Sequence, residues 1–153
     1  PLYSVYTLDS ISLPLFQKAK METVLGTKMT QFWAPDLDNA PNKKFVADFR
    51  AKYGRYPSFY AAQSYDSIMY IKSAVEAVNG DVKNIDGMRA ALEKADFPSI
   101  RGDFKMGNNH FPIQNFYERT VVKDADGNWT TAVGRAVLKD HQDPYASQCK
   151  MAG

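Results

Sequence analysis

The residues that could bind a small molecule stand at the ends of expected strands. Thr7, Leu8 and Asp9 follow a strand expected over residues 2–7. Open α/β sheets present their ligand-binding groups beyond the carboxyl ends of strands, so these three residues are candidates for a binding site. Asp9 could equally cap the next helix, an interaction worth about 1 kcal/mol that needs no ligand. The sequence leaves both roles of Asp9 open.

Two aromatic residues, Phe59 and Tyr60, open a long helix expected over residues 59–78. The free backbone N–H groups of a first helical turn and the faces of aromatic rings can meet an anionic or aromatic ligand. Packing of the same rings in the core is the competing explanation. Phe59 and Tyr60 are therefore the second group of candidate ligand-binding residues.

Catalysis has little support in this sequence. Nucleophilic catalysis needs a Ser, Cys or Thr within reach of a base, which is usually His. The only histidines are His110, in a polar turn, and His141, in a charged tail, and no Gly-x-Ser-x-Gly motif occurs. We therefore expect no catalytic residue and no enzyme activity.

A metal site or a cofactor is not expected either. Asp124, Asp126 and Asn128 match the first, third and fifth positions of a calcium loop, but the glycine stands at Gly127 instead of one residue after Asn128, and the final Glu is missing. A hairpin turn explains these residues better. The single cysteine, Cys149, cannot form a thiolate zinc site or a disulfide framework. No Gly-rich phosphate loop occurs.

The composition indicates a globular protein. The 153 residues include 19 Lys and Arg against 17 Asp and Glu, a formal charge of +2 that is too small for nucleic-acid binding. With 44% hydrophobic residues, the chain can build a core. No apolar stretch approaches the length of a membrane span. The first residues resemble a strand in progress without a signal sequence, so we expect a fragment of a larger protein; removal of a tag or signal just before residue 1 is the alternative.

Hydrophobic periodicity predicts an α/β protein. Expected strands and helices alternate in the first half, and a β-hairpin closes the second half. One helix is expected to turn a stripe that includes Ile68 toward the core, and the tail after residue 139 is expected to be irregular. The expected helices cover residues 11–23, about 45–53, 59–78 and 84–95, and the expected strands cover residues 2–7, 27–32, 102–106, 113–123 and 129–137.

Several stretches have the order and spacing of one family. They are residues 26–33 with 36–39, 45–50 with 53–57, 60–67, 78–81, 101–104, 116–122 and 126–127. Together they resemble the C-terminal half of the type I periplasmic solute-binding proteins, the Leu/Ile/Val-binding group that serves ABC importers. No single stretch is specific, but the resemblance covers nearly the whole chain.

The resemblance implies a two-lobed receptor with Rossmann-like lobes, three crossing segments and a ligand cleft between the lobes. Residues 1–32 would belong to the second, C-terminal lobe, and residues 33–117 would form the helical part of the first lobe. Residues 118–153 would return to the second lobe with the hairpin and the tail. A fragment with parts of two lobes leaves strand edges uncovered, so we expect it to form a homo-oligomer.

The resemblance also gives the candidate residues their roles. An acidic residue after the first strand pairs with the ligand ammonium in amino-acid binders, and Asp9 occupies that position. Tyr60, or Phe59 one residue earlier, matches an aromatic residue that faces the ligand. Asp9 is shorter than the Glu common among amino-acid binders, which leaves room for a hydroxylated aromatic acid.

The function implied is that of a periplasmic or otherwise extracytoplasmic receptor of an ABC importer. It would bind an amino acid or an aromatic carboxylic acid by lobe closure, without catalysis or a cofactor, and deliver it to the ABC permease. A ligand-sensing regulatory domain of the same fold is the alternative.

Overall fold

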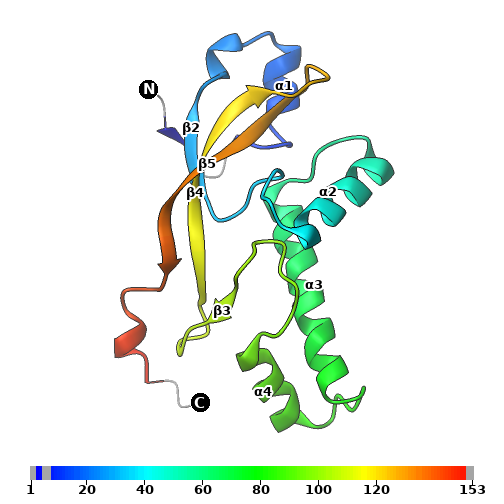
Figure 1. Ribbon diagram of the computed structural model, residues 1–153, viewed down its shortest axis with the longest axis vertical. Coiled ribbons are helices and arrows are strands. Elements are labelled where there is room, and N and C mark those ends of the chain that lie inside the picture. Colours follow the sequence, from blue (N-terminus) through cyan, green and yellow to red (C-terminus); the bar gives the residue numbers. More distant parts are fainter. Residues whose placement is uncertain (1–2, 5–7, 151–153) are drawn as a thin grey trace.

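The computed structural model describes residues 3–4 and 8–150, and these form a mixed α/β structure. Thr7 and most of the strand predicted over residues 2–7 lie outside the described residues. Figure 1 shows a long twisted β-ribbon with α1 near its upper end and with α2, α3 and α4 along one side. The elements are β1 (Tyr3–Ser4), α1 (Leu13–Lys18), η1 (Glu22–Val24), β2 (Lys28–Gln31), α2 (Ala40–Tyr53), α3 (Phe59–Ala77), α4 (Ile85–Lys94), β3 (Lys105–Met106), β4 (Pro112–Lys123), β5 (Trp129–His141) and η2 (Ala146–Gln148).

The sheet is built around β4. This strand pairs antiparallel with β2, β3 and β5, while β1 pairs parallel with β2. The predicted hairpin of β4 and β5 is confirmed. Its register shifts between Gln114 and Arg119, which is the kind of irregularity that bends a strand pair and increases its twist. The bend lets one hairpin run alongside both the α1 region and the three long helices (Figure 1).

The turn of this hairpin uses the residues that the calcium-loop pattern had also matched. Asp124 Oδ1 accepts hydrogen bonds from the backbone N–H groups of Asp126 (3.0 Å) and Asn128 (2.8 Å). Gly127 has φ +82°, a left-handed conformation that glycine adopts without steric cost. The turn predicted from Asp and Gly is confirmed.

Local capping explains where α2 and α3 begin and end. The side chain of Asn39 accepts a hydrogen bond from Asn42 N–H at the start of α2, and Ser58 accepts one from Ala61 N–H at the start of α3. Gly54, with φ +66°, ends α2 in the left-handed conformation typical of helix C-termini. The helix α3 matches its predicted range closely. The helix α2 ends at Tyr53 as predicted, but it begins at Ala40, about five residues earlier than predicted.

Other elements differ from the prediction. The helix expected over residues 11–23 is shorter, because Lys20 takes φ +54° and the chain continues as a 3₁₀ turn. Ile68 was predicted to face the core but is 65% exposed, because no described residue covers that side of α3. The strand at residues 102–106 is reduced to β3. Ordered structure continues past residue 139, where β5 extends to His141 and η2 follows.

Two separate clusters of buried apolar side chains form the core. The first core packs around α2, the start of α3 and the segment after β2, and the second core lies between α1 and the sheet. The buried members of the first core are Trp33, Ala34, Leu37, Phe45, Val46, Phe59, Ala62 and Ile100, and those of the second core are Leu8, Leu13, Met29, Val121 and Trp129.

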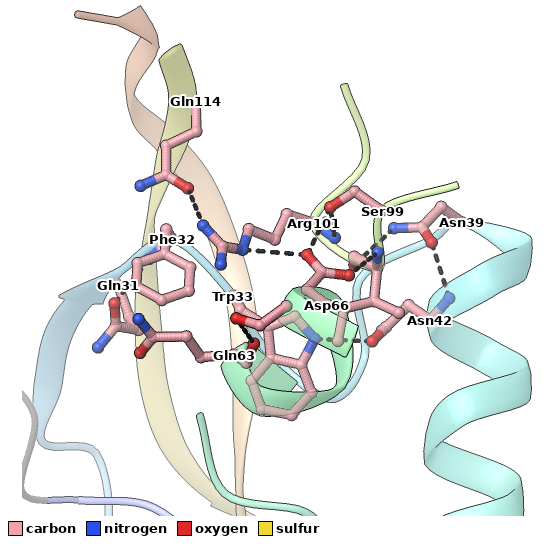
Figure 2. A network of polar contacts seen from close by, with 12 residues as sticks. Gln31, Phe32, Trp33, Asn39, Asn42, Gln63, Asp66, Ser99, Arg101 and Gln114 are labelled. Carbon is pink, nitrogen blue, oxygen red and sulfur yellow. Dashed lines mark hydrogen bonds and ion pairs between the residues drawn. The ribbon is translucent and has the colours of Figure 1, made fainter. Parts of the chain in front are cut away.

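A buried polar network fixes α3 against β4 (Figure 2). Asp66 of α3 accepts hydrogen bonds from Ser99 Oγ (2.6 Å) and Ile100 N–H (2.9 Å), and forms an ion pair with Arg101 (3.1 Å). Arg101 then donates to Gln114 Oε1 of β4 at 2.9 Å. Burial raises the pKa of Asp66 although these hydrogen bonds and Arg101 oppose the rise. The network holds α3, and thus the aromatic residues at its start, in a fixed position relative to the sheet.

Candidate functional site

The structure brings together candidate residues that lie fifty positions apart in the sequence. Phe59 N–H, at the first position of α3, donates a hydrogen bond to Asp9 Oδ2 at 3.3 Å. Leu8, Asp9 and Phe59 are buried, whereas Tyr60 is 56% exposed. Thr7 lies outside the described residues. The loop after β1 and the start of α3 therefore form one local site.

Asp9 also organises its own loop. Asp9 Oδ1 accepts a hydrogen bond from Ile11 N–H at 2.9 Å, and Asp9 N–H donates to Ser12 Oγ at 3.4 Å. Ser12, which precedes α1, makes no side-chain capping bond within the helix. The carboxylate of Asp9 thus accepts hydrogen bonds both from the turn before α1 and from the first N–H of α3. A negative charge at this end of α3 is favoured by the helix dipole.

The aromatic residues of the site take different positions. Phe59 belongs to the first core. Its ring and the Phe32 ring meet edge to face, with 6.4 Å between the ring centroids. Tyr60 packs on Phe59 with 3.9 Å between ring centroids. Core packing was the competing explanation for both rings, and it accounts for the position of Phe59. Tyr60 is the aromatic side chain of this pair that is open to a ligand or to another part of the protein.

A buried arginine, Arg119, lies in the sheet near this site, and the sequence analysis missed it. Arg119 is 2% exposed, and its Nε and Nη2 atoms both donate to Thr131 Oγ1, the former at 3.1 Å. Burial lowers the pKa of Arg119 to about 10, and the carboxylates of Asp9 and Asp36 oppose this fall. An arginine at an inward position of a predicted strand, alternating with Val121, is the signal that could have revealed it.

Gln31, at the carboxyl end of β2, is a second residue that sequence reasoning missed. It is 3% exposed, and its Oε1 atom accepts a hydrogen bond from Phe32 N–H at 3.0 Å. Figure 2 shows Gln31 and Gln63 close to the Phe32 ring. The strand-end argument that selected Asp9 applies equally to Gln31, since β1 and β2 run parallel.

A small cavity adjoins the site. It has a volume of about 230 Å³ and separates α1 from the α2–α3 connection and the hairpin turn; Ser10, Pro14, Tyr56 and Trp129 are among its lining residues. Within the described residues, no group of three or more His, Cys, Asp and Glu side chains could hold a metal ion. No helix in residues 8–150 has the length and apolar character needed to cross a membrane.

Polar groups at the carboxyl ends of parallel strands, opposite a helix start, are the arrangement of a ligand-binding α/β protein. A family model described as periplasmic binding protein matches residues 3–128. The chain therefore belongs to the periplasmic binding protein family. No curated protein matches it.

Solved structures of the same fold include a solute-binding protein of an ABC transporter from R. palustris in complex with benzoate. It is 32% identical with a TM-score of 0.76, over 98% of this chain and 39% of that one. A solute-binding protein from Rhodopseudomonas palustris HaA2 in complex with p-hydroxybenzoic acid is 25% identical with a TM-score of 0.70, over 93% and 38% of the two chains. A leucine-binding protein from Thermotoga maritima is 21% identical with a TM-score of 0.68, over 90% and 37%. The chain spans less than half the length of each of these proteins.

Proposed function

We propose that this chain forms part of an extracytoplasmic solute-binding receptor of an ABC importer. The receptor binds an aromatic carboxylic acid or an amino acid by closing two lobes, and it performs no catalysis. Family membership over residues 3–128 supports the receptor role. The complexes with benzoate and p-hydroxybenzoic acid, in proteins that are 32% and 25% identical, support the ligand class.

The lobe assignment follows the two cores. Residues 1–32 and 118–153 belong to the second lobe, and residues 33–117 belong to the first. All buried members of the second core come from the former ranges, and all buried members of the first core come from the latter. Phe32 and Val133 border the first core from the second-lobe ranges: Phe32 is the last residue before the first boundary, and Val133 pairs with Arg119, next to the second boundary.

The hydrogen bond from Phe59 N–H to Asp9 Oδ2 is the observation that carries the proposal. It joins Asp9, which follows β1 in the sequence of the second lobe, to the helix start in the first lobe, which is where a ligand between the lobes would be enclosed. Leu8, Asp9, Phe59 and Tyr60 form this side of the binding site; Thr7, outside the described residues, stays a candidate from the sequence. Asp9 supplies a polar contact and Tyr60 an aromatic face, while Leu8 and Phe59 support them from the two cores.

The partners follow from the receptor role. The complete receptor acts in the periplasm or outside the cell and delivers its ligand to an ABC permease. The 153-residue chain by itself forms a homo-oligomer, because large apolar side chains of its helices are exposed.

Isothermal titration of the complete protein with a panel of benzoates and amino acids tests the proposed function. We expect one ligand of either class to bind at micromolar concentration or below, and small-angle scattering to show a smaller radius of gyration when it is bound. Absence of binding across both classes would contradict the receptor role. Co-purification with a permease distinguishes an importer receptor from a regulatory domain.

A further inference from the structure

We propose that the charge of Asp9 is satisfied within the protein by Arg119 and two backbone N–H groups, so that the site accepts an aromatic carboxylate and rejects an α-amino acid. This inference rests on the proposed function and narrows its ligand class. Asp9 then offers its remaining lone pairs to a neutral donor, such as a ring hydroxyl, and does not serve as the counterion of an ammonium group.

The position of Arg119 in the sheet places it on the face that the second core covers. Arg119 pairs with Met29 across β2 and β4, and Val121 follows two residues later on the same face. Met29 and Val121 both belong to the second core, together with Leu8, the residue before Asp9. Arg119 therefore lies on the same face of the sheet as the second core, to which the neighbour of Asp9 belongs.

The bonds of Arg119 leave its charge available to Asp9. Its hydrogen bonds go to the neutral hydroxyl of Thr131, and within the part of the chain that the structure describes it forms no ion pair. The carboxylates of Asp9 and Asp36 both act to raise the pKa of Arg119 against the effect of burial. A buried cation whose hydrogen bonds go to a neutral hydroxyl still stabilises a carboxylate in the same region, because charges interact strongly where water is excluded.

Asp9 needs no cation from the ligand. Each of its carboxylate oxygens already accepts one backbone hydrogen bond, from Ile11 N–H and from Phe59 N–H. A carboxylate has about four lone-pair positions, so a hydroxyl can still bind to either oxygen. An ammonium group at the same place would be repelled by the Arg119 guanidinium. It would also lose its hydration shell and gain only a carboxylate whose charge Arg119 and two backbone N–H groups already compensate.

The decisive experiment compares ligands on the unmodified complete protein. Isothermal titration uses 4-hydroxybenzoate, benzoate, leucine and phenylalanine. We expect 4-hydroxybenzoate to bind at least about 100-fold more tightly than either amino acid, as a mismatched buried charge would require. Equal or tighter binding of leucine or phenylalanine would overturn this inference and leave the receptor role intact. Binding of none of the four ligands would overturn both.

Variants of Arg119 then separate its charge from its shape. Arg119→Met should favour leucine: the Kd for 4-hydroxybenzoate divided by the Kd for leucine should rise by about tenfold or more, because Asp9 loses the cation that compensates its charge. Arg119→Lys keeps the charge and should leave this ratio within about threefold of the wild type. Arg135→Met, the matched change at an exposed position of β5, should leave it unchanged. A ratio that Arg119→Met does not alter would overturn the role of Arg119. If Arg119→Met does not fold, the ligand comparison on the unmodified protein still decides the inference.

Discussion

At the residue scale, the site depends on side chains that satisfy several backbone groups at once. Asp9 serves the turn before α1 and the start of α3. Asn42 has a similar role next to the first core: its Oδ1 atom accepts from Trp33 Nε1 at 2.7 Å, and its Nδ2 atom donates to the carbonyl groups of Ala34, Pro35 and Leu37. Asn42 is fully buried, so these bonds have no replacement from water.

Asp9→Ala in the complete receptor should weaken ligand binding by about 2 kcal/mol, roughly 30-fold in Kd, because a buried acceptor is lost and the start of α3 is released. Titration of the ligand identified in the panel measures this change. Asp103→Ala, at an exposed position, is the control and should bind like the wild type. If Asp9 is only a cap, Tm will fall in Asp9→Ala while Kd stays the same.

Asn42→Ala should lower the free energy of unfolding by about 3 kcal/mol or more, because a buried indole N–H and three carbonyl groups lose their partner. Urea unfolding followed by tryptophan fluorescence measures it, since Trp33 is directly affected. A loss below about 1 kcal/mol would mean that the segment after β2 is held mainly by apolar packing.

At the element scale, the α2–α3 connection contacts the turn of the β4–β5 hairpin. Tyr56 OH donates to Asp124 Oδ2 at 3.1 Å, the Arg50 guanidinium lies 4.3 Å from the centre of the Tyr56 ring, and Arg50 reaches Asp126 at 3.7 Å. In the proposed lobe assignment, these contacts join the two lobes. They should therefore favour the closed form of the receptor.

Tyr56→Phe should raise the Kd of the complete receptor about fivefold, because one hydrogen bond worth about 1 kcal/mol is lost from the closed form. Titration with the receptor's ligand measures this. Tyr53→Phe, at a half-exposed tyrosine in α2, is the matched control and should have no effect. Unchanged affinity in Tyr56→Phe would show that the contact persists in both the open and the closed form.

The same contact predicts how stability depends on pH. Burial acts to raise the pKa of Asp124, but hydrogen bonds from Asn128, Tyr56 and Asp126 N–H outweigh it, and the pKa lies below its ordinary value. A carboxyl group with a lowered pKa in the folded state stabilises it above the pKa of the unfolded state, and this contribution is lost as the pH falls through the folded pKa. The difference in Tm between wild type and Asp124→Asn should thus be largest near pH 7 and shrink below about pH 4. A constant difference would contradict this assignment.

At the scale of the whole molecule, exposed apolar side chains mark surfaces that another chain or another part of the protein can cover. Ile68 and Ile71 are exposed on α3, Ile85 on α4, and Phe111 precedes β4. An apolar groove of about 370 Å³ lies between α3, α4 and β3, with Tyr70, Met88, Leu92 and Met106 among its lining residues. Such surfaces favour association in water.

The 153-residue chain studied alone should therefore form dimers or larger assemblies at micromolar concentration. Sedimentation velocity measures this directly, and Ile68→Asp should shift the distribution toward smaller species, because a charge cannot be buried in an apolar interface without a partner. A stable 17.2 kDa monomer in the wild type would contradict this prediction and would show that the two cores suffice without further cover.

Features that depend on a few neighbouring residues could be predicted without the structure. Asn39 and Ser58 begin α2 and α3, and Asp124 with Gly127 forms the hairpin turn, because each of these bonds closes within four residues. The order of such local signals was enough to indicate the family. Tertiary structure decided the rest: the contact of Asp9 with Phe59, the burial of Arg119 and the exposure of Ile68. Burial depends on which distant segment packs against a residue, and periodicity along the chain predicts only which residues share a face, not whether that face is covered.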